Sequence, residues 1–209
     1  MRSTVGKIVQ TEELRRHYKP PGQLAENKVI DRIEAHSRRF IELSPFCCLG
    51  TADDEGRQDV SPRGDVPGFV RVLDERRLFL PDRPGNNRLD GMQNLLANPH
   101  VGLLFLVPGF FDTLRVNGTA EVTVDPELLR ESAVEGKVPV SGLIVHVEEV
   151  FFHCGRALKR GRLWDPDAQV DRSEMPRLAA MIKDQLGSDS VVGTTIDPNR
   201  PETYMDELY

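Results

Sequence analysis

Residues 100–124, HVGLLFLVPGFFDTLRVNGTAEVTV, indicate the class of the fold. Residues 100–107 are nearly all apolar, and a short apolar run of this kind predicts a strand that is buried on both faces. In residues 114–124, apolar side chains alternate with polar ones around Gly118, which predicts a strand with one buried face. Two strands in succession, without a helix between them, favour a β domain.

The same patterns continue on both sides of this stretch. A turn cluster at residues 53–56 separates two extended segments and predicts a hairpin, and residues 74–76 separate a second pair. We predict strands over residues 46–52, 58–61, 69–73, 77–80, 100–107, 114–124 and 141–153. Strands in a row, interrupted by single helices, predict a closed or nearly closed antiparallel barrel, because a doubly wound parallel sheet requires strict alternation.

Apolar residues at helical spacing predict the flanking helices. We expect helices over residues 27–43, 86–97, 154–163 and 173–186. Asp125 followed by Pro126 predicts a helix start, since aspartate caps backbone N–H groups and proline suits the first helical position. We divide the chain into an N-terminal arm (1–26), a barrel domain (27–165) and a C-terminal helical extension with its tail (166–209), which packs on the barrel or on a partner subunit.

The composition argues against several classes of protein. The chain has 209 residues, a formal net charge of −6 and three cysteines. The negative charge disfavours nucleic-acid binding through phosphate contacts, and an odd number of irregularly spaced cysteines disfavours a disulfide framework. The first residues lack the apolar core of a signal peptide, and no stretch reaches the roughly 18 apolar residues that span a bilayer. We therefore expect a cytoplasmic protein that binds neither nucleic acid nor membrane.

Several common catalytic and metal-binding motifs are absent. The sequence contains no Gly-x-Gly-x-x-Gly fingerprint, no phosphate loop and no Gly-x-Ser-x-Gly elbow. His146, His153 and Cys154 come closest to a metal-binding set. On a regular strand His146 and His153 would point to opposite faces, and His146 and Cys154 would lie too far apart to share one ion. We expect no metal site.

The motif SPRGD at residues 61–65 ends a predicted strand with groups that suit an anion. Ser61 offers a hydroxyl, Arg63 offers a planar fork that matches phosphate oxygens, and Gly64 lets the backbone approach a ligand. The alternative interpretation is a surface turn with an exposed arginine.

The motif PGNNRLD at residues 84–90 lies between a predicted strand and a predicted helix. The first turn of a helix has unpaired N–H groups that attract anions, so Asn86 or Asn87 would cap this turn and Arg88 would add charge. The alternative is a plain helix cap with a solvated arginine. Together with the first motif, Arg63 and Arg88 could hold one phosphate from two sides.

The order and spacing of SPRGD, GNNR and RVNG resemble a bacterial subgroup of the pyridoxamine 5′-phosphate oxidase-like family of FMN-binding proteins. The resemblance covers residues from about 28 to 165. It implies a mainly β fold with flanking helices, in which six antiparallel strands form a split β-barrel. It also implies a homodimer with two FMN molecules at the subunit interface.

The resemblance assigns roles to residues from several segments. Ser61, Arg63, Asn87 and Arg88 would hold the FMN phosphate, and the backbone near Leu80 would line the flavin ring. The full set of residues implied to bind FMN is Ser61, Arg63, Leu80, Asp82, Asn86, Asn87, Arg88, Leu89, Arg115, Asn117, Lys159, Arg160 and Trp164.

The later members of this set concern the subunit interface. Arg115 and Asn117 would lie near the interface or the flavin, and Lys159, Arg160 and Trp164 would complete the site of a partner subunit. Alternatively, Trp164 anchors the core or the interface, and the two basic residues belong to a solvated helix face.

The function implied is that of an FMN-dependent oxidoreductase, with hydride transfer between the flavin and a small molecule that the sequence does not identify. The true oxidases end in a basic Arg-x-His segment, whereas this chain ends in the acidic residues 202–209, so pyridoxamine phosphate is not the expected substrate. Two alternatives stay open. The protein is a flavin carrier or redox sensor without turnover, or it is a split-barrel protein that uses a deazaflavin or haem. No catalytic residue is assigned.

Overall fold

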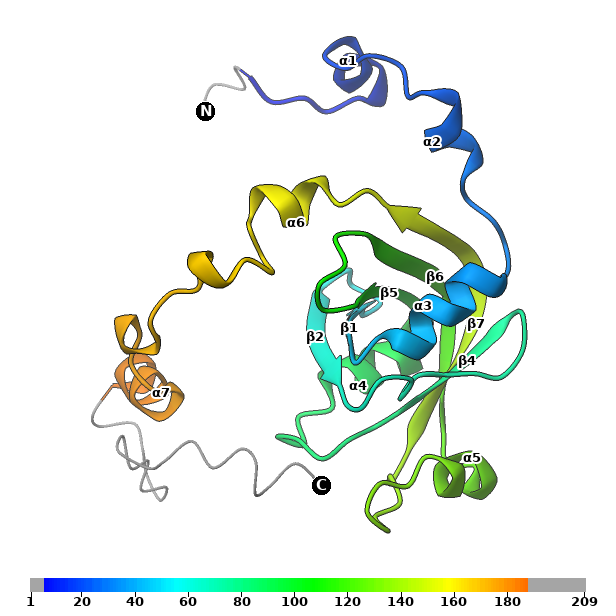
Figure 1. Cartoon of the computed structure of the whole chain (residues 1–209), viewed down its shortest axis with the longest axis vertical. Helices are drawn as coiled ribbons and strands as arrows, with labels where there is room; N and C mark the ends of the chain where they lie inside the picture. Colours follow the sequence, from blue (N-terminus) through cyan, green and yellow to red (C-terminus); the bar gives the residue numbers. More distant parts are fainter. Residues whose placement is uncertain (1–5, 188–209) are drawn as a thin grey trace.

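One antiparallel sheet organises the part of the chain that the structure describes. The computed structural model describes residues 6–187. Its strands are β1 (Phe46–Ala52), β2 (Gln58–Gly64), β3 (Arg71–Val72), β4 (Arg77–Pro81), β5 (His100–Leu106), β6 (Thr113–Thr123) and β7 (Gly142–His153). They pair in the order β2-β1-β5-β6-β7-β4-β3. Figure 1 shows the sheet curving, with α3 (Ala35–Leu43) and α4 (Asp90–Ala97) beside it.

The predicted strands are all present, and two of them, β2 and β3, differ in length from the prediction by more than one residue. Strand β2 continues past Ser61 to Gly64 and includes Pro62, and β3 is reduced to two residues. Strand β2 lies at one end of the sheet, and an edge strand tolerates proline because one side of its backbone has no neighbour to pair with.

The implied barrel of six strands differs from the structure in strand number and in closure. The sheet has seven strands, with β2 and β3 at its two ends, and no ladder joins these ends within the described residues. Ion pairs of Arg63 with Asp82 and of Arg83 with Asp65 connect β2 with the segment that follows β4, the neighbour of β3. After β2 the chain turns back, and the N–H of Gly68 donates to the carbonyl of Ser44 at 3.3 Å. The mainly β antiparallel fold with flanking helices is confirmed.

The hydrophobic core lies on the concave side of the sheet. Its fully buried side chains include Leu78 and Leu80 of β4, Phe105 of β5 and Val145 of β7. Helix α3 contributes Phe40 and Ile41 to the same core, and helix α4 contributes Met92 and Leu95. In β5 and β6 the alternate side chains lie on the other, less buried face of the sheet, whereas β4 is buried on both faces.

The predicted helix over residues 27–43 is wrong in its first half. The chain forms α2 (Gln23–Asn27), then an extended segment in which Ile30 pairs with Val150 of β7, and only then α3. Helix α3 begins where the carboxylate of Glu34 accepts hydrogen bonds from the backbone N–H groups of His36 and Ser37. The predicted start at Asp125 is confirmed, since its carboxylate caps α5 (Pro126–Glu131).

A bulge between β6 and β7 changes which face each side chain occupies. The register shifts between Asn117 and Gly118, and Val147 and Val150 are both buried although they are three residues apart. His146 and His153 therefore point to the same outer face, and the prediction that they occupy opposite faces is wrong. Within residues 6–187, no group of three histidine, cysteine or acidic residues could hold a metal ion.

Gly118 is required by this bulge, and replacing it with alanine is expected to destabilise the fold. A Cβ atom at this position would lie 1.9 Å from the carbonyl oxygen of His146, which belongs to the paired backbone and cannot move aside. We expect Gly118→Ala to lower the free energy of unfolding by about 1–3 kcal/mol. Urea unfolding measures the change, with Gly50→Ala as control because its Cβ would make only ordinary contact, 3.6 Å from Gly102. An equal effect in both variants would contradict this account.

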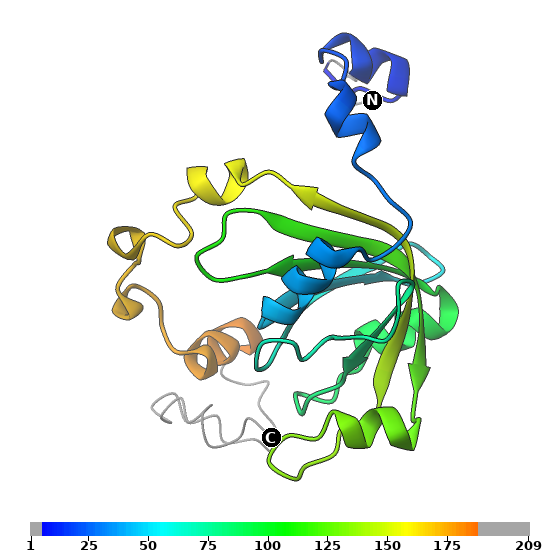
Figure 2. The same cartoon turned by 45° about the vertical axis from the view of Figure 1, so that its right-hand side comes forward.

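The segments before and after the sheet contribute little to the core. Helices α1 (Thr11–Arg16) and α2 have no buried residues, and neither does α6 (Arg156–Arg160). Short 3-10 turns at Pro166–Ala168 and Arg172–Glu174 lead to α7 (Leu178–Leu186). Figure 2 shows both segments extending away from the sheet. The division into arm, barrel and extension stays a prediction, and the acidic tail lies outside the described residues.

The described helices are too short or too polar for a membrane span. Among residues 6–187, none has the length and hydropathy that a transmembrane helix needs.

Candidate functional site

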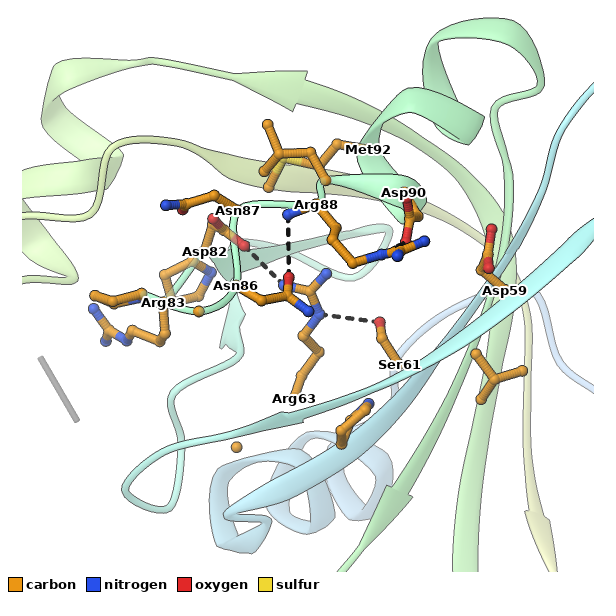
Figure 3. A pocket seen from close by; sticks show the side chains of 18 of the residues that line it. Asp59, Ser61, Arg63, Asp82, Arg83, Asn86, Asn87, Arg88, Asp90 and Met92 are labelled. Carbon is orange, nitrogen blue, oxygen red and sulfur yellow. Dashed lines mark hydrogen bonds and ion pairs between the residues drawn. The ribbon is translucent and has the colours of Figure 1, made fainter. Parts of the chain in front are cut away.

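The two anion-binding motifs line one cavity of about 450 Å³ between β2 and the start of α4. This size is typical of small-molecule sites, which measure roughly 300–1,000 Å³. Seven of the predicted residues border it, namely Ser61, Arg63, Asp82, Asn86, Asn87, Arg88 and Leu89, and Figure 3 shows most of them around the cavity.

Arg63 is held in place on the wall of the cavity. Along β2, Ser61 and Arg63 alternate with exposed residues and so share the half-buried face of the strand. The Nη1 atom of Arg63 donates to Asp82 at 2.7 Å, and its Nε atom donates to the hydroxyl of Ser61 at 3.3 Å. Only 21% of the Arg63 side chain is exposed. These contacts hold the guanidinium in place beside the cavity.

The loop before α4 has an unusual backbone. Asn87 and Leu89 have φ angles of 58° and 60°, in the left-handed region that non-glycine residues rarely adopt. Helix α4 begins at Asp90, with Leu89 at the N-cap and no side-chain capping bond. The predicted helix start at residue 86 and the predicted capping by Asn86 or Asn87 are therefore wrong. Asn86 instead accepts a hydrogen bond from the backbone N–H of Arg88 at 3.1 Å, which closes a turn before the helix.

Arg88 lies at the rim of the cavity. Its side chain is 71% exposed, and its Nε atom donates to Asp90 at 2.8 Å. The hydrogen bond and the negative charge of Asp90 raise the pKa of Arg88, and the charge of Asp59 adds to this effect. The structure thus brings Arg63 and Arg88 to the same cavity, with Arg63 largely enclosed and Arg88 in contact with solvent.

Two residues near the cavity were missed by the sequence interpretation. The carboxylate of Asp65 is buried and forms an ion pair with Arg83, whose Nη1 atom also donates to the carbonyl of Ser132. In the sequence, only the position of Asp65 after Gly64 in SPRGD indicated that it belongs to the site. No sequence feature indicated a role for Arg83. This pair connects the end of β2 with the segment after β4, so it supports the wall of the cavity.

Asn94 is a third residue that the sequence interpretation missed. It is buried on α4 and donates both to Asp59, at 2.8 Å, and to the hydroxyl of Thr51, at 3.1 Å. A polar side chain on the inner face of a helix was the available signal. These hydrogen bonds fix Asp59 in the cavity wall.

The polar groups of the cavity suit a phosphomonoester. Three arginines and three aspartates line it, and they are Arg63, Arg83, Arg88, Asp59, Asp82 and Asp90. Guanidinium groups bind phosphate oxygens, and carboxylates accept hydrogen bonds from hydroxyl groups. A ligand with one phosphate and neighbouring hydroxyls fits this mixture, whereas the aspartates would repel the additional charge of a polyphosphate.

Six predicted residues do not line this cavity. Leu80 is buried in the core, with only 1% of its surface exposed, although its neighbours Pro81 and Asp82 do border the cavity. Arg115 lies over the ring of Phe151 on the outer face of the sheet, and Asn117 donates to Glu149 at 2.9 Å. The structure therefore does not bring Arg115 or Asn117 to the site within one chain.

The three candidates from the last third of the chain lie elsewhere as well. Lys159 lies over the ring of Phe111, the indole N–H of Trp164 donates to the carbonyl of Phe110 at 2.7 Å, and Arg160 is exposed. These contacts join α6 and the following turn to the loop between β5 and β6. None of the three lines the cavity of its own chain.

The outer face of β6 and β7 carries a cationic cluster that affects one histidine. Burial, and then the positive charges of Arg115 and Lys28, lower the pKa of His153 below its ordinary value. The free energy of unfolding should therefore decrease as the pH falls below about 6.5, because the unfolded chain binds the proton more readily. We expect Arg115→Gln to raise the pKa of His153 and to reduce this decrease. NMR titration of the ring protons measures the shift, and an unchanged pKa would contradict the assignment.

We compared the chain with known proteins. The comparison with curated proteins gave no match. Among the similar solved structures are HupZ of Group A Streptococcus (20% identity, 57% of this chain and 93% of that chain, TM-score 0.47) and HutZ, the haem storage protein of Vibrio cholerae (16%, 59% and 94%, TM-score 0.40). Another is a Clostridium acetobutylicum protein of the pyridoxinephosphate oxidase family, related to general stress protein 26 (15%, 57% and 86%, TM-score 0.43).

The family model described as pyridoxamine 5′-phosphate oxidase matches residues 33–154, which include the whole sheet and both anion-binding motifs. This match covers more than half of the 209 residues. The chain therefore belongs to the pyridoxamine 5′-phosphate oxidase family.

Proposed function

We propose that the protein binds FMN in this cavity and acts as an FMN-dependent oxidoreductase on a small molecule. The observation that carries the proposal is the convergence of Arg63 and Arg88, from two separate motifs, on one cavity. Membership of the family adds support, because FMN is the cofactor that the sequence resemblance implies.

The phosphate end of FMN would be held by groups from both motifs. Arg63 and Ser61 would approach it from β2, and Arg88 with Asn87 would approach it from the loop before α4. Asp59, which also lines the cavity, is a hydrogen-bond acceptor that suits the ribityl hydroxyls next to the phosphate. The mixed lining therefore accounts for both parts of the ligand.

Bound FMN would supply the redox chemistry, while the chain supplies position and charge. In this proposal the protein is a homodimer, and residues of a second copy complete the flavin site. The residues proposed to contact the flavin of the partner come from two segments. They are Arg115 and Asn117 on the outer face of the sheet, and Lys159, Arg160 and Trp164 after β7. A cation such as Arg115 near the ring would favour the reduced, anionic form of the flavin.

Asp82 competes with the phosphate for Arg63, so removing its charge should strengthen FMN binding. The two side chains form an ion pair at 2.7 Å in which both are only about one-fifth exposed. We expect Asp82→Asn to increase FMN affinity about two- to fivefold, which corresponds to the 0.5–1 kcal/mol of a moderately exposed pair. Fluorescence titration measures the change, with Asp54→Asn in the exposed β1–β2 turn as control. Weaker binding by Asp82→Asn would mean that its carboxylate contacts the ligand.

Titration of the purified full-length protein tests the proposed function. We expect FMN to bind with one molecule per chain, and the bound flavin to be reduced by NAD(P)H and reoxidised in air. Parallel titrations with a deazaflavin and with haemin test the two alternative ligands. Binding of the deazaflavin or of haemin without binding of FMN would overturn the proposal. Binding of FMN without its reduction would show that the protein is a flavin carrier and not an oxidoreductase.

A further inference from the structure

A second hollow, of about 360 Å³, lies beside the first cavity. The two share one wall, formed by residues of the segment 82–89 together with Met92. The opposite wall of the second hollow is the segment 137–141, which leads into β7. In Figure 3, Arg83 and Asn87 of the shared wall lie on the side away from Ser61 and Asp59.

We propose that this second hollow binds the apolar body of a small organic anion, such as an aromatic or branched aliphatic carboxylate. The proposal deepens the proposed function by giving the chemical class of a second ligand beside the flavin, and it rests on that function for the role of this ligand. Binding to the hollow itself can be measured without flavin.

The chemistry of the lining differs between the two cavities. Six side chains of the second hollow are apolar, namely Pro84, Leu89, Met92, Val138, Pro139 and Val140. The first cavity is lined by three arginines and three aspartates and suits a phosphate. An apolar lining gains from contact with an apolar ligand, because both surfaces leave water.

Several of these apolar side chains are exposed around the hollow. Val140 is 87% exposed, Val138 is 50% exposed and Leu89 is 49% exposed. Single exposed apolar residues are common, but these three border the same concave surface. A ligand that fills the hollow would cover all three of them.

The shape of the hollow is maintained by the backbone of both walls. Leu89, the N-cap residue of α4, adopts a φ angle of 60°, which is unfavourable for leucine. With this backbone conformation, Leu89 lines the hollow. On the other wall, the backbones of Val134 and Lys137 exchange two hydrogen bonds, at 2.9 and 3.1 Å. Asp82 joins the walls, because its N–H donates to the carbonyl of Ser141 at 3.0 Å.

The charged residues of the second hollow favour an anionic ligand. Lys137 and Arg83 are its cations, and Arg83 is already paired with Asp65. Asp82, which pairs with Arg63, is its one acidic lining residue among those the structure describes. A carboxylate at the Lys137 end, with an apolar body among the valines, matches this arrangement. A neutral molecule of the same shape would lack the electrostatic contribution.

The test uses anilinonaphthalene sulfonate, a fluorescent probe with an aromatic body and an anionic group. We expect saturable binding to the full-length protein, one probe per chain. Val138→Asp and Val140→Asp should weaken this binding about tenfold, because each places a carboxylate in an apolar wall. Val124→Asp is the matched control, since Val124 is 70% exposed and lies outside both hollows. Circular dichroism checks that all variants are folded.

Displacement of the probe tests the ligand class. Phenylbutyrate should displace it at lower concentration than the neutral phenylbutanol, and Lys137→Met should remove most of this difference. Equal probe binding by the wild type, Val138→Asp and Val140→Asp, or equal displacement by the acid and the alcohol, would overturn the proposal. A separate FMN titration distinguishes the two failures: loss of FMN binding alone contradicts the proposed function, and loss of probe discrimination alone contradicts the second site.

Discussion

Arg63→Ala is expected to weaken FMN binding by roughly tenfold to a hundredfold. A hydrogen bond to a charged group contributes about 1.5–3 kcal/mol, and each 1.4 kcal/mol corresponds to a factor of ten in affinity. Arg63 should reach this range because its guanidinium is largely enclosed and is held beside the cavity by Ser61 and Asp82. Quenching of flavin fluorescence during titration measures the dissociation constant.

Two further variants provide the comparison for Arg63→Ala. Arg57→Ala is the control, because Arg57 lies in the same β1–β2 region, is 72% exposed and does not line the cavity. Arg88→Ala should weaken FMN binding less than Arg63→Ala, since Arg88 is in contact with solvent at the rim. Unchanged affinity in both Arg63→Ala and Arg88→Ala would exclude the phosphate assignment.

Asp65→Ala is expected to destabilise the protein by about 3–5 kcal/mol, the range for breaking a buried ion pair. The side chain of Asp65 has 0% exposure and that of its partner Arg83 has 15%. Removing the carboxylate leaves a largely buried guanidinium without this counter-charge, and it removes one of the two ion pairs that join β2 to the segment after β4. Chemical unfolding followed by circular dichroism measures the loss.

Asp74→Ala is the matched control for Asp65→Ala. Asp74 also pairs with an arginine, Arg77, but both side chains are about half exposed, so the loss should stay within about 1 kcal/mol. Asp65→Asn should fall between the two, because the amide keeps a hydrogen-bond acceptor. A loss for Asp65→Ala as small as that for Asp74→Ala would show that the pair does not stabilise the contact between β2 and the segment after β4.

The strands could be predicted from the sequence because their information is local. Alternation in residues 114–124 and the apolar run in residues 100–107 each reflect the burial of one strand, and β5 and β6 appear there. The capping of α5 by Asp125 is local in the same way. The bulge opposite Gly118 depends on how β6 pairs with β7, so the alternation rule placed His153 on the wrong face.

The two motifs that border the candidate site were predictable from the sequence, but the contacts within the site were not. SPRGD and GNNR contain groups that suit an anion, and they do line one cavity. Which aspartate pairs with which arginine depends on segments that meet only in the folded chain, such as β2 with the loop that contains Asp82 and Arg83. The left-handed backbone conformation of Leu89 could not be predicted from the sequence either, because leucine has no local preference for this region.

The comparison of FMN with riboflavin tests most directly whether Arg63 and the loop before α4 bind a phosphate. The two ligands differ only in the phosphate group, so the ratio of their dissociation constants isolates its contribution. We predict that the wild-type protein binds FMN at least about tenfold more tightly than riboflavin, and that Arg63→Ala removes most of this preference. Equal affinity of the wild-type protein for FMN and riboflavin would contradict the account.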